Sequence, residues 1–136
     1  MTADFTIAVH ALVYLNHKKT FQSSELLAKN VCTHPARIRK VMSCLKKAGL
    51  VEAKEGIDGG YAFCLNPKEL SLCQIADGMK IPFVSASWHS GNINMECLIA
   101  SGMANIMDDI YGTLDKTCRK ALENITIDQI DHEIFG

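Results

Sequence analysis

Residues 23–63, SSELLAKNVCTHPARIRKVMSCLKKAGLVEAKEGIDGGYAF, decide the fold. Ser23 or Ser24 can cap a short helix, because a serine hydroxyl accepts a free backbone N–H at a helix start. Thr33 can cap a second, basic helix that carries Pro35 in its first turn, where proline is tolerated. The apolar side chains of this basic helix recur at helical spacing, so one of its faces is expected to be buried.

Two extended runs follow the basic helix, Leu50–Lys54 and Tyr61–Leu65. The segment between them, Glu55–Gly60 (EGIDGG), has three glycines and an aspartate, which is typical of a hairpin turn. A further helix is expected over residues 4–16. Two short helices, a basic third helix and a glycine-tipped hairpin form the order of a winged helix-turn-helix, in which the third helix enters the DNA major groove.

The rest of the chain is expected to be helical. Ser71 can cap a short helix, and residues 80–93 read as an irregular loop, a candidate sensory region. A long helix is predicted from about Asn94 to about Glu123, and a short helix closes the chain. The predicted fold is therefore mainly α with a small β-hairpin: a winged helix-turn-helix DNA-binding domain at 1–79, the loop at 80–93, and a dimerisation helix with the terminal short helix at 94–136.

Charge is concentrated in one segment. The 136 residues include 14 Lys+Arg and 15 Asp+Glu. Within residues 33–54, however, six basic residues stand against a single acidic one. This excess indicates contact with a polyanion, although a solvated helix face would have the same composition.

We expect base contacts from the start of the basic helix, and backbone contacts from its end, the serines and the hairpin. The predicted DNA-binding residues are Ser23, Ser24, His34, Arg37, Arg39, Lys40, Ser43, Lys46, Lys47, Lys54, Gly59, Gly60 and Tyr61.

The segment at 23–63 resembles the DNA-binding half of the Rrf-two family of bacterial transcription regulators. Its most specific parts are Leu45–Val51 (LKKAGLV) and Gly59–Tyr61 (GGY), and Asn124–Ile130 resembles the family's terminal segment. The resemblance covers nearly the whole chain. It implies a homodimeric repressor or activator that reads a near-palindromic double-stranded DNA operator. We expect a repressor, and we expect it in the cytoplasm.

The chain departs from the family pattern in two places. Glu55 stands where the wing commonly has arginine, and Asp58 replaces a glycine. Because acidic groups are unfavourable beside phosphates, the wing is expected to contribute less, through Lys54 and backbone amides. The iron–sulfur members carry three clustered cysteines, whereas residues 80–100 contain only Cys97. We therefore expect no cluster, no metal and no cofactor.

Residues 80–97 hold the candidate sensor. Cys97 is expected in the first turn of the long helix, where the helix N-terminus lowers the pKa of a thiol and suits it to sense an oxidant. The alternative is an unreactive helix residue. Phe83, Trp88 and His89 could line a pocket for a small-molecule effector, or simply cover the core.

The six cysteines contain no C-x-x-C pair, so a structural zinc site is not expected. A disulfide framework is not expected either, since the chain has no secretory signal. Most cysteines, including Cys32 and Cys44, are expected to be small buried side chains.

The long helix carries an apolar stripe that a single protomer cannot cover. About thirty residues span roughly 45 Å, more than the width of a winged-helix domain. A two-fold partner helix is the simplest cover, and the alternative is a helix folded back at Gly102 or Gly112. The predicted dimer-interface residues are Met95, Ile99, Met103, Ile106, Ile110 and Leu114.

The sequence leaves one other function class open. A winged helix that binds an acidic protein instead of DNA is favoured slightly by Glu55 and Asp58. An enzyme is not expected, because no catalytic triad order, phosphate loop or dinucleotide fingerprint is present. A membrane-spanning helix is not expected either, because no run of about 18 apolar residues is present.

Overall fold

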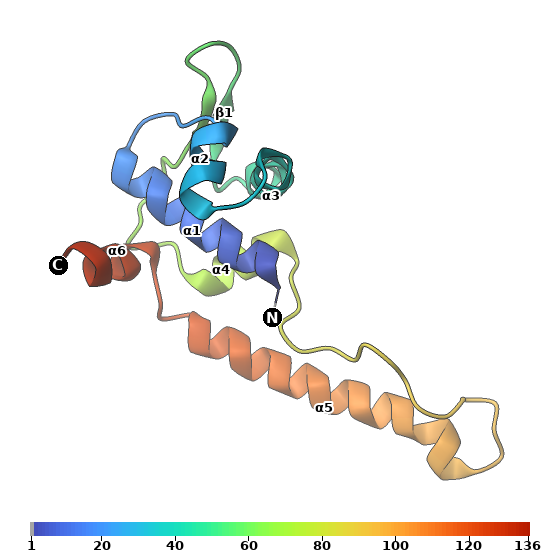
Figure 1. Cartoon of the computed structure of the whole chain (residues 1–136). Coiled ribbons are helices and arrows are strands. Elements are labelled where there is room, and N and C mark those ends of the chain that lie inside the picture. Colours follow the sequence, from blue (N-terminus) through green and yellow to red (C-terminus); the bar gives the residue numbers. More distant parts are fainter. Residues whose placement is uncertain (1) are drawn as a thin grey trace.

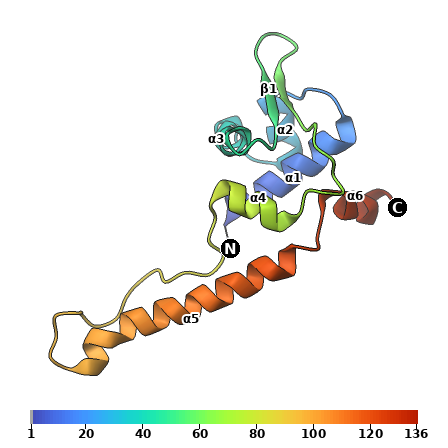
Figure 2. The same cartoon turned by 180° about the vertical axis from the view of Figure 1, so that it is seen from behind.

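A computed structural model describes residues 2–136 of the chain (Figure 1). The elements within those residues are α1 (Ala3–Lys18), α2 (Ser24–Val31), α3 (Pro35–Lys47), β1 (Glu52–Lys54), β2 (Gly60–Ala62), α4 (Leu72–Met79), α5 (Leu98–Leu122) and α6 (Ile127–Phe135). Five of the helices and the hairpin gather into one body, and α5 projects from it as a long arm (Figures 1 and 2). The predicted class, mainly α with a small hairpin, is confirmed.

Local sequence signals account for most helix starts. The Ser23 hydroxyl accepts the Leu26 N–H at 3.2 Å, and Ser71 and Gln74 form a reciprocal capping box. The predicted cap at Thr33 is wrong, because His34 is the N-cap of α3 and its side chain makes no capping bond. Pro35 starts that helix instead, since it has no N–H to satisfy and its φ is already helical.

The wing is fixed to the segment that precedes α2. Glu52 pairs with Ala62 and Lys54 with Gly60, so both strands are shorter than the sequence predicted. The backbones of Gln22 and Tyr61 exchange two hydrogen bonds of 2.9 Å. Gly60 has φ +142°, and a Cβ there would lie 2.2 Å from the Gln22 carbonyl oxygen. Only glycine permits this close approach.

The core joins helices from both ends of the chain. Its largest fully buried side chains are Leu12, Leu15, Leu27, Ile38, Val41, Met42, Leu45, Ile75 and Ile127. Four of these come from α3, so the core holds that helix by one face. Ile127 brings α6 into the same core, and α6 packs against α1. The last helix is thus part of the body rather than of the arm.

The arm is one continuous helix, and none of its residues is fully buried by the rest of the protomer. It runs through Gly102 and Gly112 without folding back (Figure 1). It begins at Leu98, later than predicted, because Asn92 bends the preceding chain: its side chain accepts the Asn94 N–H at 2.9 Å. Met95 therefore lies in the loop and not on the helix.

The prediction that most cysteines are buried is wrong. Cys73 is buried and Cys118 partly so, whereas Cys32, Cys44, Cys64 and Cys97 are exposed. Cys32 is the left-handed C-cap of α2, with φ +64°. Cys44 lies on the outer face of α3, between core positions.

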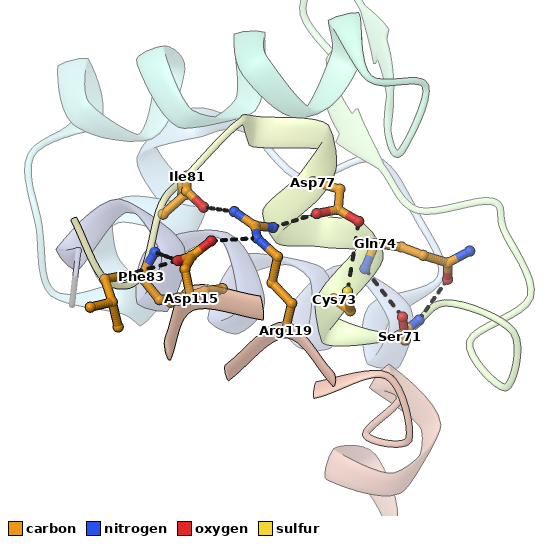
Figure 3. Close-up of polar contacts among 9 residues, drawn as sticks. Ser71, Cys73, Gln74, Asp77, Ile81, Phe83, Asp115 and Arg119 are labelled. Atoms are coloured by element: carbon orange, nitrogen blue, oxygen red, sulfur yellow. Dashed lines mark hydrogen bonds and ion pairs between the residues drawn. The ribbon is translucent and has the colours of Figure 1, made fainter. Parts of the chain in front are cut away.

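A carboxylate on the arm holds the loop that leaves the body (Figure 3). Asp115 accepts the backbone N–H groups of Phe83 at 2.6 Å and Val84 at 2.9 Å. Its other oxygen accepts Arg119 Nε at 3.0 Å. Because two loop amides and one guanidinium meet a single carboxylate, the loop and the arm are tied at this point.

Arg119 extends the tie to the body. It also donates to the carboxylate of Asp77 on α4 and to the carbonyl of Ile81 (Figure 3). Beside it, the Phe83 ring packs edge-on against Phe5 of α1, with the centroids 5.0 Å apart. The base of the arm is therefore anchored to both α4 and α1.

This anchor makes an acid-stability prediction. The Val84 N–H, with further help from Arg119 and the Phe83 N–H, holds the pKa of Asp115 below its ordinary value. A carboxylate with a lowered folded pKa stabilises the fold above its unfolded pKa of about 4, and that contribution is lost as the pH falls through the folded pKa. Urea unfolding of Asp115→Asn should therefore lose less stability between neutral and acid pH than the parent.

Asp109→Asn, which removes an exposed carboxylate from the same helix, is the control for the change in charge. Parallel stability curves for the parent and Asp115→Asn would contradict the anchor.

Candidate nucleic-acid interface

The two faces of α3 divide as the sequence predicted. Ile38, Val41, Met42 and Leu45 are buried in the core. All the α3 residues predicted to meet DNA, with the N-cap, are exposed: His34, Arg37, Arg39, Lys40, Ser43, Lys46 and Lys47. The helix therefore presents a continuous basic face to solvent.

A polar notch of about 510 Å³ lies between the start of α2, α3 and the wing. It gathers eight of the predicted DNA-binding residues: Ser23, Ser24, Ser43, Lys46, Lys54, Gly59, Gly60 and Tyr61. The other five predicted residues lie along α3 outside it. Hydroxyls, ammonium groups and the amide end of a helix together are the donors that a phosphate needs.

Two carboxylates also line the notch, Glu25 and Glu55. Glu25 was missed from the sequence, where it reads as a favourable acidic residue in the first turn of α2. Its Oε2 accepts the Ser24 hydroxyl at 3.3 Å. The notch therefore has mixed charge, and the acidic residues stand on its α2 and wing sides.

The two arginines of α3 have different partners. Arg37 donates from Nε and Nη2 to Asp4 Oδ1, both at 3.2 Å, which holds its guanidinium toward α1. Arg39 Nη1 lies 3.4 Å from the Ser24 hydroxyl, beside the notch. Asp4 was not foreseen, because it is 33 residues from Arg37 in the sequence.

The wing uses several of its own polar groups internally. The Gly59 N–H donates to the Gly56 carbonyl at 3.1 Å, and the Tyr61 N–H donates to Gln22. Neither amide is free for a phosphate. Ile57, at the wing tip, is fully exposed.

The candidate sensor residues lie in separate surroundings. Phe83 is buried against Phe5, whereas Trp88 is exposed and His89 Nε2 lies 2.9 Å from Asp108 on the arm. Cys97 is the exposed N-cap of α5. The N–H groups of Ala100, chiefly, and of its neighbour Ile99 lower the pKa of its thiol.

The comparisons with known proteins agree with this geometry. The Rrf2 family model, described as an iron-dependent transcriptional regulator, matches residues 1–133. The chain belongs to the Rrf2 family. It is thus a member of a family of transcriptional regulators and not of enzymes.

Among similar proteins, this Rrf2 chain is 24% identical to YwnA of Bacillus subtilis, described as a candidate HTH-type transcriptional regulator, over 95% of each chain. A solved structure of a candidate transcriptional regulator from Lactobacillus plantarum is 24% identical, with a TM-score of 0.84 over 98% of this chain and 91% of that one. CymR, the global cysteine regulator of B. subtilis, is 15% identical, with a TM-score of 0.69 over 98% and 96%. The TM-scores establish the shared fold with these solved structures.

The family description names iron. Among residues 2–136, no three His, Cys, Asp or Glu side chains lie close enough together to hold a metal ion. The donor set of this protomer therefore does not fit an iron centre. None of the helices in the described part of the chain is long and apolar enough to cross a membrane.

The cysteines provide a direct test of the Cys97 environment. Desolvation, with the neighbouring Glu52, raises the pKa of Cys64, the opposite direction from Cys97. Because the thiolate is the nucleophile, iodoacetamide should modify Cys97 at a lower pH than Cys64. Mass spectrometry of both peptides from one reaction, over a pH series, measures the difference. An equal or higher midpoint for Cys97 would contradict the assignment.

Proposed function

We propose that the chain is a homodimeric, sequence-specific DNA-binding transcriptional repressor. The observation that carries the proposal is the notch, in which serines, lysines and the wing meet beside the exposed basic face of α3. A backbone phosphate seated in the notch would lay α3 along the major groove. Such a regulator works beside the chromosome, in the cytoplasm.

The predicted residues then divide by role. Arg39 and Lys40, with His34, face the base edges, because they stand at the start of α3. Arg37 joins them when its guanidinium leaves the carboxylate of Asp4 and binds DNA instead. Contacts to the DNA backbone come from Ser23, Ser24, Ser43, Lys46, Lys47, Lys54 and Tyr61. Gly59 and Gly60 let the wing approach, by their close packing against Lys54 and Gln22.

Dimerisation is assigned to the arm. Apolar side chains of α5, Ile106, Ile110 and Leu114, are exposed in the protomer, and an isolated apolar stripe of this length would aggregate. A second copy would cover it and place two α3 helices on the two halves of a near-palindromic operator. Met95, Ile99 and Met103 extend the stripe toward the arm's far end.

Cys97 is the proposed sensor of an oxidant, since it is exposed and its thiol is acidified by the start of α5. A small-molecule effector remains the second form of signal. Anisotropy titrations with DNA from upstream of the chain's own gene, before and after mild peroxide, with scrambled DNA as control, test binding and sensing together. If peroxide abolishes DNA binding by the parent but not by Cys97→Ser, the result would support the thiol sensor.

One observation favours a second candidate function. The wing tip combines the fully exposed Ile57 with Glu55 and Asp58, a surface better suited to a protein than to a phosphate. A winged-helix interaction module that does not read DNA would use this surface. Equal affinity for operator and scrambled DNA would favour that reading.

The residue roles predict different effects on DNA binding. Arg39→Ala should cost about 1–3 kcal/mol on the operator and relax base preference, because it removes a base contact. Lys47→Ala should weaken all DNA alike and lower the salt slope by about one, because it removes a phosphate contact. Anisotropy titrations over a salt series measure both.

Lys68→Ala, a charge removed from the turn after the wing, is the control. The assignment of α3 would be refuted if Arg39→Ala and Lys47→Ala both bind like the parent.

The arm predicts the oligomeric state. Ile110→Glu places a charge in the middle of the apolar stripe, where pairing would bury it, so the dimer should dissociate. Sedimentation velocity should then show a monomer with unchanged helix content by circular dichroism. Asp109→Glu, one residue away, should remain dimeric. A parent protein that is monomeric at micromolar concentration would overturn the dimer.

A further inference from the structure

The first turn of α1 carries two contacts to other elements. Among residues 2–6, only Asp4 and Phe5 are partly buried, and full burial in α1 begins at Ile7. The N-cap bond of this turn is long, since the Thr2 hydroxyl accepts the Phe5 N–H at 3.4 Å. A helix end with a weak cap and few buried side chains opens readily. The first turn therefore depends on the partners of Asp4 and Phe5.

The first contact is with α3. Arg37, in the first turn of that helix, donates from Nε and Nη2 to Asp4 Oδ1, both at 3.2 Å. The first turn of α3 has no acidic residue of its own, and its N-cap, His34, makes no side-chain capping bond. Asp4 thus brings to the start of α3 the negative charge that favours a helix N-terminus, and it engages the guanidinium of Arg37.

This ion pair is exposed enough for DNA to compete with it. The side chain of Arg37 is 47% exposed and that of Asp4 is 34% exposed. Such a pair contributes little to stability, because water competes for both charges. When DNA takes the guanidinium, as the proposed function requires, Asp4 loses its partner. The first turn of α1 then keeps only the contact made by Phe5.

The second contact is with the base of the arm. The Phe5 ring meets the Phe83 ring edge-on, with the centroids 5.0 Å apart. The Arg119 guanidinium lies over the same Phe83 ring, 5.4 Å from its centroid. The backbone N–H groups of Phe83 and Val84 donate to the Asp115 carboxylate (Figure 3). Phe83 therefore joins the first turn of α1 to the anchor of the arm.

The two contacts are coupled because Asp4 and Phe5 are consecutive residues of one short turn. When the Asp4–Arg37 pair breaks, the turn gains freedom and the packing of Phe5 on Phe83 weakens. By linkage the reverse also holds, so looser packing at Phe83 weakens the ion pair and makes Arg37 more available. The two states differ in the partner of Arg37, which is Asp4 in the free protein and DNA in the complex.

We propose that the Asp4–Arg37 pair is an autoinhibitory contact, which the first turn of α1 couples to the base of the arm. Asp4 holds Arg37 back from DNA while Phe5 is packed on Phe83, and DNA binding loosens residues 81–84 in return. The inference rests on the proposed function and adds its regulation. A signal that reaches the base of the arm changes the DNA affinity through α1.

Hydrogen exchange tests the coupling from the DNA side. The amides of Phe83 and Val84 exchange when their bonds to Asp115 open. The probe is a duplex that the parent protein enriches from a random pool. Saturation with this duplex should speed exchange in residues 81–86 of the parent by roughly two- to fivefold, because the coupling cannot exceed the free energy of an exposed ion pair. Asp4→Ala, which has already lost the pair, should show no change on binding.

Asp58→Ala is the control for the change in charge, because it removes an exposed carboxylate from the wing tip and leaves Arg37 paired. Its residues 81–86 should respond to the duplex as the parent does. Exchange that is equal or slower in the DNA-bound parent would overturn the inference and leave the proposed function standing. A parent that selects no duplex from the pool would overturn both together.

A double-mutant cycle tests the coupling from the arm side. Phe83→Leu keeps an apolar side chain in the core and removes the aromatic contact with Phe5. It should strengthen binding of the same duplex roughly two- to fivefold in the parent and leave the affinity of Asp4→Ala unchanged. Trp88→Leu makes the same substitution at an exposed residue of the loop and should have no effect.

Anisotropy titrations give the affinities, and urea unfolding shows beforehand that each variant is folded. Asp4→Ala alone should also bind more tightly than the parent, by more than Asp58→Ala does. Equal effects of Phe83→Leu in the presence and absence of the Asp4 carboxylate would refute the coupling.

Discussion

The burial of one face of α3 is the constraint on which the rest of the structure depends. Ile38, Val41, Met42 and Leu45 are almost wholly removed from water, and together they fix the rotation of the helix about its axis. Every basic side chain of α3 is then forced outward, because no position on the buried face carries a charge. The exposed basic face of α3 is thus a consequence of core packing, and α1, α2 and α4 provide the other side of that core.

The wing is held beside α2 by contacts between backbones. Gly60 approaches Gln22 more closely than any side chain allows, and the Gln22–Tyr61 backbone pair then fixes the hairpin beside the start of α2. Gly59 packs just as closely against the Lys54 carbonyl oxygen, where a Cβ would lie at 2.2 Å, so backbone packing alone explains both glycines of GGY. Their presence therefore says little about whether the wing reads DNA, and Glu55 in the notch weakens that role.

Local signals were readable from the sequence, and distant contacts were not. The serine caps, Pro35 and the periodicity of α3 depend on residues within one or two helical turns, so they predicted the elements and the division of α3 into two faces. Asp4 pairs with Arg37 across 33 residues, and Asp115 holds Phe83 and Val84 across more than 30, and neither contact leaves a sequence pattern. Cys44 was misjudged by residue type although its place off the apolar stripe marked it as exposed. Glu25 in the notch was missed because a carboxylate in the first turn of a helix is explained equally well by the helix dipole.

The anchor at Arg119 determines what a signal in the arm can do. Arg119 joins α5 to α4 through Asp77, and α4 packs on α3 so closely that a Cβ at Gly78 would lie 3.0 Å from the Cβ of Ala48, the C-cap of α3. A displacement at the base of the arm would therefore be passed to α4 through the Arg119–Asp77 ion pair, and from α4 to α3, on which it packs. If two copies pair through their arms as proposed, the spacing of the two α3 helices on the operator is set at the bases of the arms. A change in the arm would then alter DNA affinity by changing that spacing, without altering any residue that touches DNA.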